Sequence, residues 1–260
     1  MKIRYIALSL LTVVALSACR GEEDDKAQTD VAKPLPNVEV SKLSDMTWPQ
    51  NVETNAPLSS TPLMANNMIV LDMSGSMKEE GCSGAHPTRA AAASDALKTW
   101  METRTNENIG LITFSKNGLK MDAGLGQGDS HMDGLVNIIN TVQPGSATPL
   151  KSAMTLAQDE LEKQAVRQGG TGTYRMIIIT DGAASTGEHP GGVVRDIVDN
   201  PANMIEIHTV GFCIKGAHSL NDPNRVFYID AHSPEALAEG LQSTGEKSTF
   251  SDTDFKEFSQ

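Results

Sequence analysis

Three short segments of this 260-residue chain carry oxygen donors of the kind that hold a divalent cation. The first segment places Asp72, Ser74 and Ser76 in the pattern Asp-x-Ser-x-Ser. The second contains Thr148, and the third ends in Asp181. Carboxylate and hydroxyl oxygens are hard ligands, which suit Mg²⁺, Mn²⁺ or Ca²⁺ better than a soft metal ion. The chemistry that these residue types indicate is therefore metal binding.

Buried strands are predicted directly before two of these segments. Residues 68–71 and 177–179 are uninterrupted apolar runs, as expected for strands of a parallel sheet that is covered on both faces. Asp72 and Asp181 are expected just beyond such strands, and Thr148 in a loop before a helix. Open α/β folds bind ligands at the carboxyl edge of the sheet. We therefore expect the three segments to meet at that edge.

The rest of the chain alternates between strand and helix patterns. Further strands are expected at 108–115, 119–123, 205–214 and 226–229. Helices are expected at 88–100, 131–142, 150–161, 193–198 and 234–244, where apolar residues recur at helical spacing or helix start signals occur. Such alternation predicts a doubly wound α/β fold, in which a mostly parallel sheet has helices on both faces.

The order of the three motifs resembles that of the von Willebrand factor type A domain. Asp-x-Ser-x-Ser is followed by Thr-Pro-Leu at 148–150 and by a strand ending in Thr-Asp-Gly at 180–182. These segments are similar to the metal-ion-dependent adhesion site of that family, and the resemblance covers about residues 63–247. It implies a Rossmann-like fold with direct or nearly direct metal contact by three hydroxyls, those of Ser74, Ser76 and Thr148. It also implies contact partly through water by Asp72 and Asp181.

Charge counting suggests what such a site would do. Two carboxylates balance a dication and the other donors are neutral, so a metal at an exposed sheet edge favours a carboxylate from outside. We interpret the chain as a binding module whose protein partner presents Asp or Glu. A metal-dependent hydrolase and a purely structural turn are the alternatives. We expect no enzyme, because the sequence offers no general base at a defined offset and lacks Gly-x-Ser-x-Gly, His-Glu-x-x-His and phosphate-loop motifs.

The first residues are typical of an exported protein. Lys2 and Arg4 precede an apolar run at 6–16, which predicts a signal peptide over residues 1–18. Leu-Ser-Ala-Cys at 16–19 resembles a bacterial lipoprotein box, which implies that Cys19 carries lipid and anchors the protein at the cell envelope. Ordinary cleavage with an incidental Cys19 is the alternative. Arg20 replaces the aspartate of the inner-membrane retention signal, and this favours the periplasmic face of the outer membrane.

Two flanking segments look polar rather than folded. Residues 19–62 are acidic and broken by prolines, which predicts a tether, and 248–260 form a polar tail. The formal net charge of the whole chain is −12, and no basic stripe occurs, so we expect no nucleic-acid partner. With Cys19 lipidated, Cys82 and Cys213 remain as one pair near the same sheet edge. We predict a disulfide between them, with two free thiols as the alternative.

Overall fold

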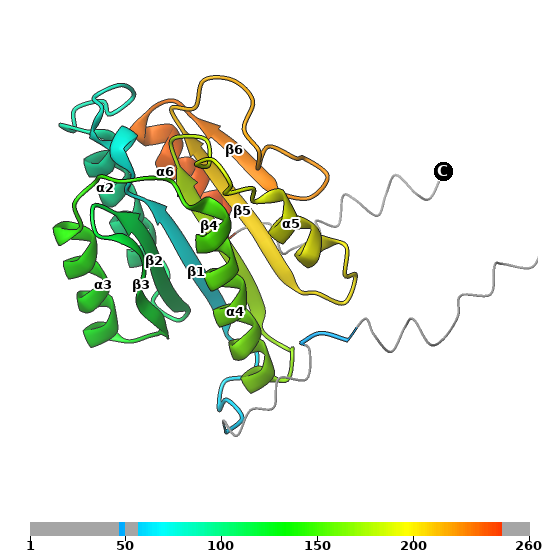
Figure 1. The fold of residues 1–260 in the computed structure, drawn as a ribbon. Coiled ribbons are helices and arrows are strands. Elements are labelled where there is room, and N and C mark those ends of the chain that lie inside the picture. Colours follow the sequence, from blue (N-terminus) through cyan, green and yellow to red (C-terminus); the bar gives the residue numbers. More distant parts are fainter. Residues whose placement is uncertain (1–46, 50–56, 246–260) are drawn as a thin grey trace, which may run out of the picture. The chain divides into compact units, whose positions relative to one another are not determined.

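The computed structural model describes residues 47–49 and 57–245, and Figure 1 shows the arrangement of their elements. Six strands form one sheet in the order β3-β2-β1-β4-β5-β6. The strands are β1 Ala65–Asp72, β2 Asn108–Ser115, β3 Gly118–Gly126, β4 Thr173–Thr180, β5 Ile205–Phe212 and β6 Phe227–Ala231. The helices are α2 Arg89–Glu102, α3 Asp129–Thr141, α4 Leu150–Gln168, α5 Gly191–Val198 and α6 Pro234–Ser243, with the short 3-10 helix η1 Gly75–Lys78 after β1. The predicted doubly wound α/β fold is confirmed.

All neighbouring strands pair in parallel except β2 and β3, which are antiparallel. The central strand β1 pairs with β2 on one side and β4 on the other. Its last seven residues are all buried, because helices cover both faces of the sheet. The glycine-rich edge strand β3 is longer than the predicted 119–123.

Successive residues of β1 point to opposite faces of the sheet and enter two separate cores. Ile69 and Leu71 pack in the core formed with α2, α3 and α6. Met68 and Val70 pack in the core formed with α4 and α5, which cross the near side of the sheet in Figure 1. The apolar stripes predicted for the helices at 88–100 and 150–161 supply buried residues to these cores, as predicted.

Two strand ends differ from the sequence prediction, and both differences matter at the carboxyl edge. The strand β5 ends at Phe212 rather than at 214, because Cys213 has a left-handed backbone conformation, with φ of 59°. The strand β1 runs one residue further than its apolar run and includes Asp72, whose side chain is fully buried. The expectation that Asp72 lies beyond the buried strand is therefore wrong.

The described residues of the predicted tether contact the end of α4 and the start of β4. The ring of Trp48 packs edge-on against Tyr174, with 5.0 Å between centroids. The Ser59 N–H donates to the Arg167 carbonyl at 2.7 Å, and Gln168 Nε2 donates to the Thr61 carbonyl at 3.0 Å. The predicted signal peptide, the lipidation site Cys19 and the tail 248–260 lie outside the described residues. Within the described part of the chain, no helix is long and apolar enough to cross a membrane.

Candidate metal site

The carboxylate of Asp72 lies at the end of β1, with both oxygens hydrogen-bonded. Its Oδ1 accepts from the Ser74 N–H at 2.7 Å, and its Oδ2 accepts from the Thr180 hydroxyl at 2.7 Å. Thr180 is the last residue of the neighbouring strand β4, so this bond joins the ends of two adjacent strands. Asp72 is therefore fixed in place by residues of both strands.

Burial raises the pKa of Asp72 to about 6. This pKa is a net result: burial and the negative charge of Asp181 raise it, while hydrogen bonds from Ser74 and Thr180 lower it. Two carboxylates that lie close together away from water repel each other when both are ionised. A divalent cation between them would remove this repulsion, which makes the pair suitable for a metal.

Hydroxyl groups connect the two aspartates through the turn that follows β1. The Oγ atoms of Ser74 and Ser76 are 3.1 Å apart, and Ser76 Oγ donates to Asp181 Oδ1 at 2.6 Å. Both serines are placed by the start of η1, which turns the chain immediately after the strand. Asp72, Ser74, Ser76 and Asp181 thus form one continuous hydrogen-bonded set, assembled from the ends of β1 and β4.

The loop containing Thr148 lies against the same turn. The Gly75 N–H donates to the Ser146 carbonyl at 3.1 Å, and the Gly145 N–H donates to the Met73 carbonyl at 2.8 Å. Ser146 has a φ of 74°, a left-handed conformation that is uncommon for residues other than glycine. The structure therefore places the Thr148 loop beside the Asp-x-Ser-x-Ser turn through backbone contacts.

Ser185 after β4 and His218 after β5 complete the edge. The Ser185 side chain accepts from the Thr148 N–H at 2.9 Å, and the Ser185 N–H donates to the Thr148 carbonyl at 3.0 Å. His218 Nε2 lies 2.9 Å from the Gly182 carbonyl, and its Nδ1 accepts from the Leu220 N–H at 3.2 Å. Burial lowers the pKa of His218, consistent with a neutral ring that donates to Gly182. These contacts fix the chain that follows Asp181.

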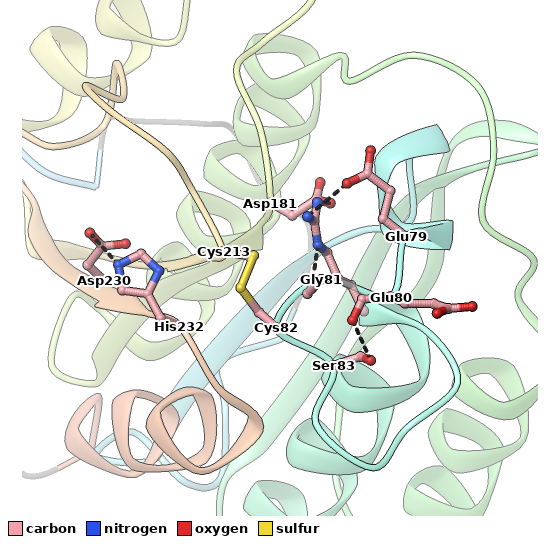
Figure 2. Close-up of a disulfide and its surroundings, with 10 residues drawn as sticks. Glu79, Glu80, Gly81, Cys82, Ser83, Asp181, Cys213, Asp230 and His232 are labelled. Carbon is pink, nitrogen blue, oxygen red and sulfur yellow. Dashed lines mark hydrogen bonds and ion pairs between the residues drawn. A yellow bond between two sulfur atoms is a disulfide. The ribbon is translucent and has the colours of Figure 1, made fainter.

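The predicted disulfide between Cys82 and Cys213 is confirmed, and it lies at this edge (Figure 2). Its Cα atoms are 5.8 Å apart. Both cysteines have left-handed backbones, with φ of 64° for Cys82 and 59° for Cys213. The bond joins the loop between η1 and α2 to the end of β5, so it fixes the segment that leaves the Asp-x-Ser-x-Ser turn.

Sequence reasoning missed one charged residue of the site, Arg89. Its Nη1 lies 3.0 Å from Asp181 Oδ2, and both side chains are almost completely buried. It also missed the role of Thr180, although this residue stands in the Thr-Asp-Gly motif. An arginine at the start of a helix carries no distinctive signal, because its contact with Asp181 depends on how the intervening loop folds.

The donor set fits a small hard cation. Among the described residues, no group of three or more His, Cys, Asp or Glu side chains is placed to hold a metal. A metal at this edge would therefore depend on serine and threonine hydroxyls beside the two aspartates. Such oxygen-only ligands are typical of Mg²⁺, Mn²⁺ and Ca²⁺.

Comparison with known proteins agrees with the family resemblance that the three motifs predict. Residues 67–183 match the model of a family described as von Willebrand factor type A domain. A von Willebrand factor type A structure from Catenulispora acidiphila has a TM-score of 0.55 at 14% identity, over 71% of this chain and 42% of that chain. Proximal thread matrix protein 1 from the mussel byssus, with a zinc-occupied MIDAS motif, has a TM-score of 0.53 at 14% identity, over 70% of this chain and 47% of that one.

A third structure is part of a much longer protein. The pilus adhesin SpaC from Lactobacillus rhamnosus GG has a TM-score of 0.52 at 15% identity, over 73% of this chain and 31% of that chain. The present chain thus spans less than half the length of each of these three proteins. At such identities the likeness is one of fold. A search of curated proteins found no match.

Proposed function

Because residues 67–183 match the von Willebrand factor type A family, we propose that this chain is a metal-dependent protein-recognition module. The carboxyl edge of the sheet would hold a divalent cation, and the cation would bind an acidic side chain of a partner protein. The residues proposed to hold the metal are Asp72, Ser74, Ser76, Thr148 and Asp181.

The observation that carries this proposal is the hydrogen-bonded set at the ends of β1 and β4. Its two aspartates are buried and repel each other, and the oxygens between them belong to neutral hydroxyls. A dication there would be balanced by two negative charges and would still accept an outside oxygen ligand. The zinc-occupied site of the mussel protein supports the idea that this fold can hold a metal at such a motif.

We propose binding rather than hydrolysis because of the groups that contact the two carboxylates. In the described part of the chain these are hydroxyls, a backbone N–H and the guanidinium of Arg89. None of them is a general base for activating a metal-bound water. The pilus adhesin among the structures of similar fold supports a binding role.

Calorimetric titration with Mg²⁺ tests the metal site directly. Wild-type protein should bind one Mg²⁺, and Ser76→Ala should weaken binding about tenfold or more, because one of the proposed oxygen ligands is lost. Ser130→Ala is the matched control, since Ser130 is an exposed serine of α3. No heat of binding with wild type, or equal affinities for both variants, would refute the metal site.

The partner is tested by capture from cell-envelope extract on immobilised protein. The proposal requires a partner that is retained in Mg²⁺ and lost both in chelator and on the Ser76→Ala protein. Substituting each Asp and Glu of its contact region in turn should identify one carboxylate that the interaction needs. A partner that binds equally well in chelator would contradict bridging through a metal.

We further propose that the protein is lipid-anchored through Cys19, on the periplasmic side of the cell envelope and at the outer membrane. The support is the signal-like sequence of residues 1–18 and the Leu-Ser-Ala-Cys that ends at Cys19. Mass spectrometry of the mature N-terminus should find a diacylglyceryl group, and Cys19→Ser should release the protein from membranes. A variant that stays in the membrane after alkaline washing would contradict this anchor.

A further inference from the structure

Arg89 is a buried cation at the edge of the proposed metal site. It is the first residue of α2, directly after Thr88, whose side chain caps the helix by accepting from the Ala91 N–H at 3.2 Å. From there its side chain makes three polar contacts, and Figure 2 labels the three partner residues. These are with Asp181 Oδ2 at 3.0 Å, the Gly81 carbonyl at 2.9 Å and Glu79 Oε2 at 2.8 Å.

The two acidic partners of Arg89 differ in their exposure. The Asp181 side chain is fully buried, whereas that of Glu79 is 62% exposed. Charges on an exposed side chain are screened by water and salt, while a buried pair is screened much less. The guanidinium therefore acts mainly on Asp181, and it does so from the oxygen that Ser76 leaves free.

We propose that Arg89 is a specificity residue of the metal site. Its guanidinium partly neutralises the Asp181 carboxylate and so weakens the attraction between Asp181 and the metal. This inference rests on the proposed function and deepens it. Without Arg89, the two aspartates would neutralise a dication completely. With Arg89 included, the buried charges sum to +1 once the dication is bound, and an outside carboxylate would cancel the remainder. Arg89 thus weakens binding of the metal alone and favours binding of the metal together with an anionic ligand.

The loop before α2 holds the guanidinium in this position. A Cβ atom added to Gly81 would lie 3.1 Å from Arg89 Nη2 and 3.9 Å from Cys213 Sγ. Gly81 therefore fits closely between the arginine and the disulfide, and Cys82 follows it directly. Because the disulfide fixes this loop to the end of β5, it holds in place the Gly81 carbonyl that accepts from Arg89 Nε.

Titration with Mg²⁺ alone is the first test. Arg89→Gln removes the charge and keeps hydrogen-bonding capacity, so affinity for Mg²⁺ should rise on the order of tenfold to a hundredfold. Arg89→Lys keeps the positive charge, so its Mg²⁺ affinity should stay much closer to that of wild type than the affinity of Arg89→Gln does. A folded Arg89→Gln protein whose Mg²⁺ affinity equals or falls below that of wild type would overturn the proposal, as would equal gains in both variants.

Sodium acetate serves as a carboxylate probe in the same titration. In wild type, acetate should raise the apparent affinity for Mg²⁺, because metal and anion favour each other's binding reciprocally. In Arg89→Gln this increase should be several-fold smaller. An acetate effect that is unchanged by the substitution would contradict the assigned role. Sodium chloride at equal ionic strength is the control for screening.

A second pair of variants tests the proposal even where Arg89→Gln fails to fold. Glu79 and Glu80 are adjacent exposed residues, and Glu79 forms the ion pair with Arg89. In Figure 2, Glu80 points away from that pair. Glu79→Gln should lower Mg²⁺ affinity more than Glu80→Gln does, because it leaves the charge of Arg89 less compensated. Equal effects of the two substitutions would refute the role of Arg89.

The two proposals fail in different ways. If wild-type protein does not bind Mg²⁺, the proposed metal site is wrong and the role of Arg89 falls with it. Suppose instead that wild type binds Mg²⁺, that Arg89→Gln has the same Mg²⁺ affinity as Arg89→Lys, and that Glu79→Gln has the same affinity as Glu80→Gln. Only the proposed role of Arg89 is then wrong.

Discussion

Substitution of Asp72 by Asn should make the protein more stable in chelator, and Mg²⁺ should remove most of this advantage. In the folded chain the pKa of Asp72 is about 6, against an ordinary value of 3.8. This difference costs the folded state about 3 kcal/mol once the carboxyl group is ionised. Asn has nearly the same shape and no charge. Its oxygen can still accept from the Ser74 N–H, and its amide group can donate to the Thr180 hydroxyl.

The sign of the pH dependence follows from proton binding. Between about pH 4 and pH 6 the folded state keeps the proton of Asp72 while the unfolded state loses it, so stability falls as pH rises through this range. Above pH 6 to 7 the full cost is present. In chelator, the advantage of Asp72→Asn over wild type should therefore be near zero at pH 4 and about 3 kcal/mol at pH 7.5, less any hydrogen-bond strength that is lost.

Chemical denaturation at several pH values, with and without Mg²⁺, measures these differences. At 100 times its dissociation constant, Mg²⁺ should stabilise wild type by about 2.7 kcal/mol and the variant by much less. The advantage of the variant at pH 7.5 should therefore fall from about 3 kcal/mol in chelator to near zero in Mg²⁺. A difference between the two proteins that is constant from pH 4 to pH 7.5 in chelator would refute the buried-carboxylate reasoning. Equal stabilisation of both proteins by Mg²⁺ would refute metal contact.

Three further predictions concern the elements that hold the site. Ser185→Ala leaves the Thr148 N–H without its acceptor and should lower Mg²⁺ affinity about fivefold. The Mg²⁺ affinity of the control Ser130→Ala should be that of wild type, and equal calorimetric affinities of the two variants would contradict this prediction. Replacing Cys82 and Cys213 by Ser opens a link over 131 residues and should cost about 4–5 kcal/mol of unfolding free energy, and dithiothreitol should affect only wild type. Burial lowers the pKa of His218, so as pH falls the unfolded state takes up a proton on this histidine at a higher pH than the folded state does. The free energy of unfolding should therefore decrease as pH drops below about 6.5. The contribution of His218 to this decrease should be absent from His218→Gln.

Sequence patterns predicted the fold well where one local signal was sufficient. The apolar runs at 68–71 and 177–179 mark β1 and β4, because strands buried on both faces need continuous apolar residues. Helical spacing marked α4, and the disulfide was predicted from the cysteine count together with the expected lipidation of Cys19. Element ends were less predictable, since a single left-handed residue such as Cys213 can end a strand.

The structure brings four of the five proposed metal ligands into one hydrogen-bonded set and places the Thr148 loop beside them. Two features could not be predicted from the sequence. The burial of Asp72 depends on the pairing of the last residue of β1 with β2 and on its bond from Thr180. The contact of Arg89 with Asp181 joins residues that are 92 positions apart and requires the loop at 79–88 to fold back.

The position of β1 also affects how the chain can fold. β1 is the first strand in the sequence, yet it lies in the middle of the sheet, and its partner β4 follows about 108 residues later. A contact of this length forms slowly, because a long loop must close before the pairing gives any stabilisation. Until β4 is in place, β1 presents an apolar strand with unpaired backbone groups, an edge to which other chains can add. The same pairing brings Asp181 to Asp72, so the proposed cation-binding arrangement forms only in molecules that have passed the stage at which they are most prone to aggregate.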